Sequence, residues 1–411
     1  MPEFSMKETV LNSSRHLRRS RALFAIGVVV ALAAAGCSSG ASKPTGSGAV
    51  STVNIGLEAA LTGVYKPVGT DLRDGFQLYL AGHGGKLGGH PVNLIVGDEG
   101  TGAATAVPVA QKMIADDHLL ALTGLVAGDS VAAISHLTTK ANIPLIGSNA
   151  RPNLPDISSL WTTSFMSADP GTAIAPYIKS NVSGPVYAIG PDYQGGYDEV
   201  NGFTDAFAKA GGQLANPGGK TTWTPWPTTT DFSPYLAKIA ASGAKAIYCF
   251  YAGGDAIGFV KQWAQSDAKN IPLYSAGFLT EGGVLQAEGP AATGVTGVLN
   301  YAPDADTATN RAFVAAWSKS HNGAQPTTFA MASYDAAAVL DQAIAKAGAD
   351  PTAQTVNAAL GTLGQIDSPR GTWQFGSVTH APVQQWYLRK VVLDGSVLAN
   401  VKIQNLATLG S

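Results

Sequence analysis

The sequence predicts an α/β protein built from two doubly wound lobes, each with a parallel sheet, joined by a hinge. Short apolar segments alternate with segments of helical spacing along most of the chain, and this rhythm is typical of βαβ units. Roughly 360 residues follow the N-terminal region, which is more than a single hydrophobic core usually serves. A second alternating series starts after Asp169-Pro170-Gly171, so we expect a cleft between two lobes.

The N-terminal region has the pattern of an export signal followed by a tether. Four arginines between 15 and 21 precede an uncharged apolar run over 22–35, and that run is shorter than the about 20 residues a membrane-spanning helix needs. Small residues lead directly into Cys37, which resembles the lipobox of bacterial lipoproteins. We expect 1–37 to be a lipoprotein signal with Cys37 lipidated, and the Ser- and Gly-rich segment 38–51 to be a flexible tether. An ordinary signal peptide with an accidental cysteine is the alternative.

Composition narrows the classes of partner. Charged residues make up 13% of the chain and the net charge is −2, against a usual charged fraction of about 25%. The sequence has no basic stripe, so we expect no nucleic-acid partner. After Cys37 the remaining cysteine is Cys249, inside the apolar run AIYCFY. We therefore expect a buried, inert thiol and no internal disulfide in the mature body.

The first series of elements follows the βαβ rhythm from residue 52 onward. Strands are indicated where apolar and β-branched residues run together, and helices where apolar residues recur every three or four positions. The expected strands are Thr52–Ala60, Pro91–Val96, Leu119–Gly124 and Ile143–Ile146, and the expected helices are Leu72–Leu80 with its neighbours, Ala103–Asp117 and Asp129–Thr139. A parallel sheet with helices on both faces follows from this order.

The second series repeats the pattern and then returns to the first lobe. Its expected strands are Pro185–Ile189, Ala244–Tyr251 and Pro272–Ser275, and its expected helices are Tyr197–Ala210, Phe232–Ala241 and Asp255–Ser266. From Tyr301 the chain continues the first lobe with helices at Asn310–His321 and Met331–Ala347. It ends in two β-rich runs, Gln385–Leu393 and Val397–Ile403, around Asp394-Gly395, which is a strong hairpin signal. We assign 52–170 and 302–384 to the N-terminal lobe, and 171–301 and 385–411 to the C-terminal lobe.

The turns after the strands are the expected ligand site. In open α/β sheets, ligands bind at the carboxyl ends of the strands. These turns are rich in Gly, Ser, Thr, Asn and Tyr, which present N–H groups, hydroxyls and aromatic faces to a small ligand. They read LTGVY (61–65), LVAGDS (125–130), GSNAR (147–151), PDYQGG (191–196), AGGD (252–255) and FLTEGG (278–283).

Motifs that would indicate an enzyme are incomplete. The run GDSVA at 128–132 lacks the second glycine of a nucleophile elbow, and a serine that opens a helix, as Ser130 does, usually caps it. The seven histidines have no metal-ligand spacing. The glycine-rich segment 82–89 follows a helix rather than a strand, so it is no dinucleotide fingerprint. We expect no enzyme, cofactor or metal. A hydrolase that uses Ser130 and a sensor subunit for a membrane kinase stay as competing hypotheses.

Nine segments carry a family resemblance through their order and spacing. They are VNIGLEAALTG, GGKLGGHPVNLIVGDEGT, GLVAGDS, IPLIGSNA, DFSPYLAKIAASGAKAIYCFYAGGDAIGFVKQW, GFLTEGGVL, ATGVTGVLNYAPD, SYDAAAVL and DSPRG. Together they resemble the type I periplasmic binding proteins of the branched-chain (leucine-binding) amino acid transport family, which are solute receptors of ABC importers. DFSPYLAKI, FYAGGDA, DSPRG and QQWYLRK look most like a branch that includes receptors for aromatic acids. The resemblance implies two lobes on a three-segment hinge that close on a solute.

The resemblance also implies roles for individual residues. In the family, the carboxylate of an amino-acid ligand meets hydroxyl and N–H groups of turns that match 126–130 and 147–151 here. The ligand's ammonium group meets an acid that aligns with Glu281, although a loop glutamate alone is usually just solvated. Tyr193 and the 251–255 turn are the nearest matches to the aromatic that closes over the ligand. The expected ligand-binding residues are Tyr65, Val126, Ala127, Gly128, Ser130, Ser148, Asn149, Ala150, Arg151, Tyr193, Tyr251, Asp255 and Glu281.

The predicted function is therefore an extracytoplasmic, lipid-anchored substrate-binding protein of an ABC importer. We expect a monomer that binds an amino acid between its lobes and is recognised by the membrane-embedded permease subunits. An aromatic or other small carboxylic acid is the alternative ligand, because Arg151 in the 147–151 turn would suit an organic acid through bidentate pairing.

Overall fold

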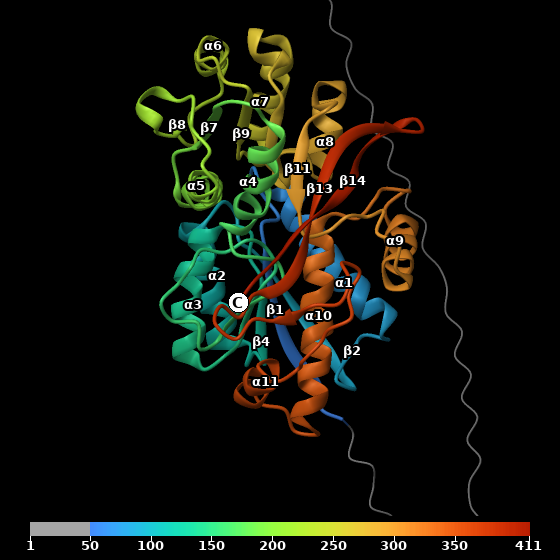
Figure 1. Cartoon of the computed structure of the whole chain (residues 1–411). Helices are drawn as coiled ribbons and strands as arrows, with labels where there is room; N and C mark the ends of the chain where they lie inside the picture. The colour runs from blue at the N-terminus through green and yellow to red at the C-terminus, as the bar shows by residue number, and fades with distance from the viewer. Residues whose placement is uncertain (1–49) are drawn as a thin grey trace, which may run out of the picture. The chain divides into compact units, whose positions relative to one another are not determined.

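Two sheets organise residues 50–411, the part of the chain that the computed structural model describes (Figure 1). The predicted signal segment, Cys37 and residues 38–49 of the tether lie outside the described residues. The first sheet has six strands in the order β2 (Lys86–Leu87), β3 (His90–Asp98), β1 (Val53–Ala59), β4 (Ala121–Gly124), β5 (Leu145–Gly147) and β6 (Leu160–Thr162). All of its pairings are parallel except β2 with β3.

The second sheet has eight strands and a mixed character. Its order is β12 (Gln374–Phe375), β13 (Pro382–Asp394), β11 (Thr296–Leu299), β10 (Leu273–Ala276), β9 (Ala246–Cys249), β7 (Val186–Pro191) and β8 (Thr222–Thr224), with β14 (Val397–Leu409) beside β13. Strands β7 to β11 pair in parallel, and β12, β13 and β14 add antiparallel edges. The short central strands are buried on both faces, as parallel strands covered by helices should be.

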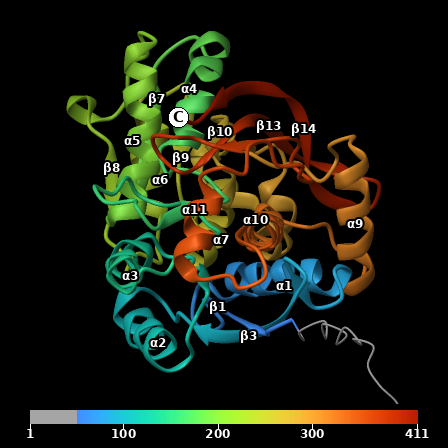
Figure 2. The ribbon, with the colours of Figure 1, turned by 90° about the horizontal axis from the view of Figure 1, so that it is seen from below.

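Helices cover the sheets of both lobes. In chain order they are α1 (Lys66–Gly82), α2 (Ala103–Asp116), α3 (Gly128–Ala141), α4 (Asp169–Asn181), α5 (Gln194–Lys209), α6 (Ser233–Ala241), α7 (Gly253–Gln265), α8 (Gly283–Glu288), α9 (Ala308–Ser320), α10 (Thr328–Ala347) and α11 (Ala353–Leu360). Helices α1 and α10 lie side by side in both ribbon views (Figure 2). Gly75 permits this contact, because a Cβ there would lie 2.1 Å from the carbonyl oxygen of Ala330.

The predicted fold class, α/β with two lobes, is confirmed. The C-terminal hairpin is also present, with Asp394 paired to Val397 across the turn. The sequence analysis assigned no helix between Asp169-Pro170-Gly171 and the strand at 185–189, whereas Asp169 begins α4. The physical reason is that proline suits the first turn of a helix, where its missing N–H group would have no partner, and an acidic residue there complements the helix dipole. The chain passes from the first sheet to the second after β6, returns after β11, and passes back before β12.

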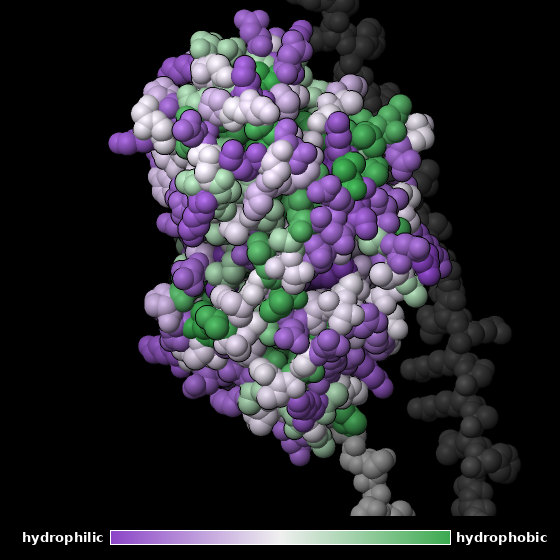
Figure 3. Space-filling model, viewed as in Figure 1, coloured by the Kyte–Doolittle hydropathy of each residue, from purple (hydrophilic) through white to green (hydrophobic). Residues whose placement is uncertain are grey.

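The surface in Figure 3 mixes polar and apolar residues, with a small apolar group where the β13–β14 hairpin lies. Leu393 and Val397, which flank the hairpin turn, are 66% and 57% exposed.

Across residues 50–411, no helix is long and apolar enough to cross a membrane, and no group of His, Cys, Asp or Glu is arranged to hold a metal ion. Cys249 is fully buried and free, as predicted.

Candidate ligand site

A cavity of about 180 Å³ lies where loops from both sheets meet. Its lining comes from segments that follow β1, β3, β4, β5 and β6 of the first sheet and β7, β8, β9 and β10 of the second, so the carboxyl ends of strands from both lobes converge on it. This is the position at which open α/β sheets bind ligands. An apolar cavity of about 150 Å³ is known to accommodate one benzene molecule. The space therefore suits a ligand with one small ring or a short branched chain.

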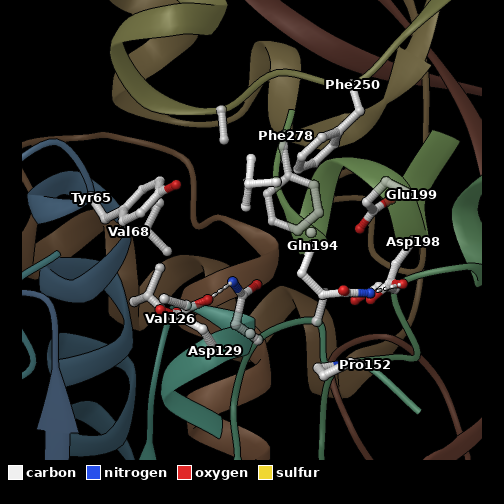
Figure 4. Close-up of a pocket in the computed structure, with 18 of the residues that line it drawn as sticks. Tyr65, Val68, Val126, Asp129, Pro152, Gln194, Asp198, Glu199, Phe250 and Phe278 are labelled. Atoms are coloured by element: carbon white, nitrogen blue, oxygen red, sulfur yellow. Dashed lines mark hydrogen bonds between the residues drawn. The ribbon is translucent and has the colours of Figure 1, made fainter. Parts of the chain in front are cut away.

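Aromatic side chains form much of the wall. They are Tyr65, Tyr193, Trp226, Phe250 and Phe278. The ring centroids of Tyr193 and Trp226 are 4.8 Å apart, and those of Phe250 and Phe278 are 5.6 Å apart in an edge-to-face contact. Figure 4 shows Phe250 and Phe278 next to each other, with Tyr65 on the other side of the view. Such rings offer flat apolar faces and polarised edges that favour another planar ring.

Several helices begin at the cavity, among them α3, α5 and α7. Ala127, Tyr193 and Ala252 are the residues before α3, α5 and α7, and all three line it. The first-turn N–H groups of a helix have no acceptor within the helix and carry a positive partial charge. None of these three helices has a side-chain hydrogen bond from its capping residue in the described chain. The convergence therefore favours a bound anion such as a carboxylate.

Glu99 already occupies part of the α3 end. Its carboxylate accepts the N–H groups of Val126 at 2.6 Å and of Ala127 at 2.8 Å. Burial raises the pKa of Glu99 to about 7, although these two N–H groups oppose the rise. Burial and the charge of Glu99 together raise the pKa of Glu58 behind it to about 8. The N–H groups of Gly128 and Asp129, in the first turn of α3, remain for a ligand.

Acidic residues, and no Lys or Arg, are found among the cavity's lining residues within 50–411. Asp129 accepts the N–H group of Ala103 at 3.1 Å, and Asp198 accepts the side-chain amide of Gln194 at 2.8 Å. Glu199 is 2% exposed, and its Oε2 atom has no hydrogen-bond partner in the described chain. A ligand carboxylate here would be held by N–H and hydroxyl groups instead of a guanidinium.

Seven of the thirteen residues expected at the site line this cavity. They are Tyr65, Val126, Ala127, Gly128, Asn149, Ala150 and Tyr193. Val126 and Ala127 contribute wall surface, because their N–H groups are taken by Glu99. Asn149 donates its side-chain amide to the carbonyl of Val126 at 2.8 Å, which fixes one loop against the other.

Glu281, the expected partner of a ligand's ammonium group, does not line this cavity. Its Oε2 atom is 2.6 Å from Nη2 of Arg389, and its Oε1 atom accepts the N–H group of Thr328 at 2.9 Å. Both side chains of the ion pair are almost fully buried. They border a second cavity of about 680 Å³ beside β14, away from the aromatic wall. The carboxylate is therefore engaged within the protein.

Arg151, the expected carboxylate partner, does not line this cavity either. Its guanidinium donates to the carbonyl groups of Pro152 and Thr379, and the side chain is fully buried. The charge of Asp169 also acts on this guanidinium, so its interactions lie within the protein.

The four other expected residues lie outside the cavity lining. Ser130 and Ser148 are fully buried, and the hydroxyl of Ser148 lies 3.4 Å from that of Thr123. Tyr251 packs between Phe232 and Phe259 with its hydroxyl 3.2 Å from Thr224 Oγ1, so it belongs to the core. Asp255 lies in the first turn of α7 without lining the cavity.

Sequence reasoning missed several lining residues. Phe250 and Phe278 end or follow predicted strands, so the strand-end rule was a usable signal for them. Trp226 lies in WTPWP, whose tryptophans suggest either loop packing or a cleft rim. Asp198 and Glu199 sit inside α5, where an acidic pair normally indicates a solvated helix face. No sequence signal identified them.

The chain belongs to the periplasmic binding protein family, whose family model matches residues 52–396. The resemblance identified from the sequence is thereby confirmed. A Leu/Ile/Val-binding protein homolog 6 of Brucella melitensis is 28% identical over 367 residues, covering 87% of this chain and 92% of the relative. The chain is accordingly a substrate-binding protein of the ABC-transporter type, and its relatives are extracytoplasmic solute-binding proteins rather than enzymes.

Solved structures with the same fold include receptors for two ligand classes. An ABC-transporter solute-binding protein from R. palustris in complex with benzoate is 29% identical, with a TM-score of 0.79, covering 88% of this chain and 98% of that one. A second R. palustris protein, in complex with 4-hydroxybenzoate, is 27% identical with a TM-score of 0.79, covering 87% and 97%. A branched-chain amino acid binding protein from Streptococcus pneumoniae, in complex with isoleucine, is 19% identical with a TM-score of 0.71, covering 86% and 99%, and shares the fold.

Proposed function

We propose that this substrate-binding protein captures a small aromatic carboxylate for an ABC importer. The observation that carries the proposal is the combination of an aromatic wall with helix N-termini around a space of about 180 Å³. The wall supplies apolar faces for one ring. The helix ends supply N–H donors and positive partial charge for a carboxylate. The benzoate and 4-hydroxybenzoate complexes of the R. palustris relatives support this ligand class.

The polar end of the ligand is assigned to the first turn of α3. The N–H groups of Gly128 and Asp129 are there, and no intrahelical acceptor exists for them. Tyr65 and Tyr193 line the same cavity, and burial raises the pKa of the Tyr193 hydroxyl well above its ordinary value. Burial raises the pKa of Tyr65 to about 12, so both hydroxyls stay protonated at neutral pH and can donate hydrogen bonds.

An amino acid is the second candidate, and the acidic residues of the cavity favour it. Asp198 and Glu199 line the cavity without a basic side chain to neutralise them. The positive charge of a ligand's ammonium group would neutralise these carboxylates. The Brucella relatives named as Leu/Ile/Val-binding homologues support the same class.

Closure of the lobes would complete the site, since residues of both lobes line the cavity. We assign 52–170 with 302–384 to one moving lobe and 171–301 with 385–411 to the other, so that ligand binding shifts the open and closed populations.

The lipid anchor is assigned to Cys37. Cys37→Ala is expected to release the mature protein from the membrane fraction, and a variant that stays membrane-bound would contradict the anchor.

Titration calorimetry separates the two ligand classes. The proposal predicts saturable one-to-one binding of benzoate or a hydroxybenzoate, with at least about tenfold weaker binding of leucine and isoleucine. Phe278→Ala is the site variant, since its ring lies in the wall, and Leu393→Ala on the hairpin is the matched control, since its side chain is 66% exposed. Tight binding of leucine or isoleucine without binding of any aromatic acid would replace the proposal with the amino-acid alternative.

A further inference from the structure

Glu199 is the most unusual polar group around the cavity. It lies in α5, one turn beyond the helix start, and its side chain lines the cavity although it is 2% exposed. Its Oε2 atom has no hydrogen-bond partner within residues 50–411. An enclosed polar atom without a partner costs about 1–3 kcal/mol. A group of this kind facing a ligand space indicates that the ligand supplies the missing partner.

The surroundings of Glu199 favour its neutral form. Burial raises its pKa well above the ordinary value, and the nearby carboxylates of Asp169 and Asp198 raise it further. The positive charge of Arg151 lowers the pKa of Asp169. The charged groups that shift the pKa of Glu199 are both carboxylates. A protonated carboxyl group has one O–H donor and free acceptor positions. Its natural complement is a group that also both donates and accepts, such as a hydroxyl.

The position of Glu199 relative to the ring site determines which part of the ligand it would meet. Figure 4 shows Glu199 close to Phe250 and Asp198, on the side of the view opposite Tyr65. The carboxylate of the ligand is assigned to the α3 end, near Asp129. Glu199 would therefore meet a substituent on the ring, away from the carboxylate.

We propose that Glu199 makes the cavity selective for aromatic acids that carry a ring hydroxyl group remote from the carboxylate. The inference rests on the proposed function and names the substrate class within it. Asp198 also has one oxygen, Oδ2, without a partner in the described chain, but it is the weaker candidate because its Oδ1 atom already accepts the side-chain amide of Gln194. A site built to hydrogen-bond a hydroxyl discriminates against the analogue that lacks it, because the carboxyl group is again left without a partner.

The test compares benzoate, 3-hydroxybenzoate and 4-hydroxybenzoate by titration calorimetry on the purified protein. The wild type is expected to bind at least one hydroxybenzoate about tenfold or more tightly than benzoate. Glu199→Met, which keeps the side-chain length without polar atoms, should abolish this preference. Glu199→Gln retains hydrogen-bonding capacity and should keep most of the preference. Asp205→Asn is the matched control, since Asp205 is an exposed acid of the same helix outside the cavity.

Each outcome decides one of the two claims. Equal wild-type affinity for benzoate and both hydroxybenzoates overturns the role of Glu199 and leaves the aromatic-acid function standing. A preference that survives Glu199→Met also overturns that role. Failure of the wild type to bind any of the three acids, together with binding of leucine or isoleucine, overturns the proposed function itself.

Discussion

Truncation of Glu281 should destabilise the fold and leave ligand affinity intact. The carboxylate of Glu281 and the guanidinium of Arg389 lie 2.6 Å apart, with side chains that are 4% and 1% exposed. Glu281→Ala would leave that guanidinium buried without its counter-charge and would free the N–H group of Thr328. Breaking a buried ion pair by removing one partner costs about 3–5 kcal/mol. The bond from Arg389 to the carbonyl of Tyr301, at 3.2 Å, offsets only part of this loss.

Urea unfolding monitored by circular dichroism measures the effect. The midpoint of Glu281→Ala should fall well below that of the wild type. The double variant Glu281→Leu/Arg389→Met should recover most of the loss, because no buried charge is then left alone. Asp116→Ala is the control, since it removes an exposed pair with Lys112 and should change stability by less than about 1 kcal/mol. The reasoning is refuted if Glu281→Ala unfolds at the wild-type midpoint and no longer binds ligand.

Three further predictions follow from the site and its surroundings. Gly253→Ala should weaken ligand binding, because φ is +56° and a Cβ there would lie 2.9 Å from the carbonyl oxygen of Val64; wild-type affinity in calorimetry would contradict this. Ligand binding should change the intrinsic fluorescence, because Trp226 lines the cavity with its ring centroid 4.8 Å from that of Tyr193. Trp226→Phe should remove most of this change. An undiminished fluorescence change in the variant would locate the ligand elsewhere. Burial raises the pKa of Glu58 from its ordinary value of 4.5 to about 8 in the folded state. The contribution of Glu58 to stability therefore falls as the pH rises from 4.5 to about 8, because the folded state binds the proton more tightly than the unfolded chain. Glu58→Gln should flatten the dependence of the melting temperature on pH, and parallel profiles would show that Glu58 does not titrate as described.

The fold was largely predictable because its strands and helices have strong local patterns. The apolar run that forms β1 and the helical spacing of α1 and α7 need no distant information. Short strands such as β6, with three residues, have too few positions for a periodicity to be recognised. Helix α4 was missed, although an acidic residue and a proline in its first turn are signals for a helix start.

The loops of the site were predictable, but the orientation of their side chains was not. Chain topology alone brings strand ends together, so Tyr65, Gly128 and Tyr193 follow from the order of the elements. Glu281 and Arg151 lie in loops of the same kind, yet their partners are 108 and 228 residues away in the sequence. No local pattern records such partners. The role of Glu199 likewise depends on what surrounds α5 in three dimensions.

The central claim is that the aromatic cavity holds one carboxylate-bearing ring. A crystal structure of the protein grown with 4-hydroxybenzoate tests it most directly. The account predicts density for one ring against Phe250 and Phe278, with the carboxylate at the N–H groups of Gly128 and Asp129 and the hydroxyl at Glu199. An empty aromatic cavity at saturating ligand, or density beside Glu281 and Arg389 instead, would contradict it.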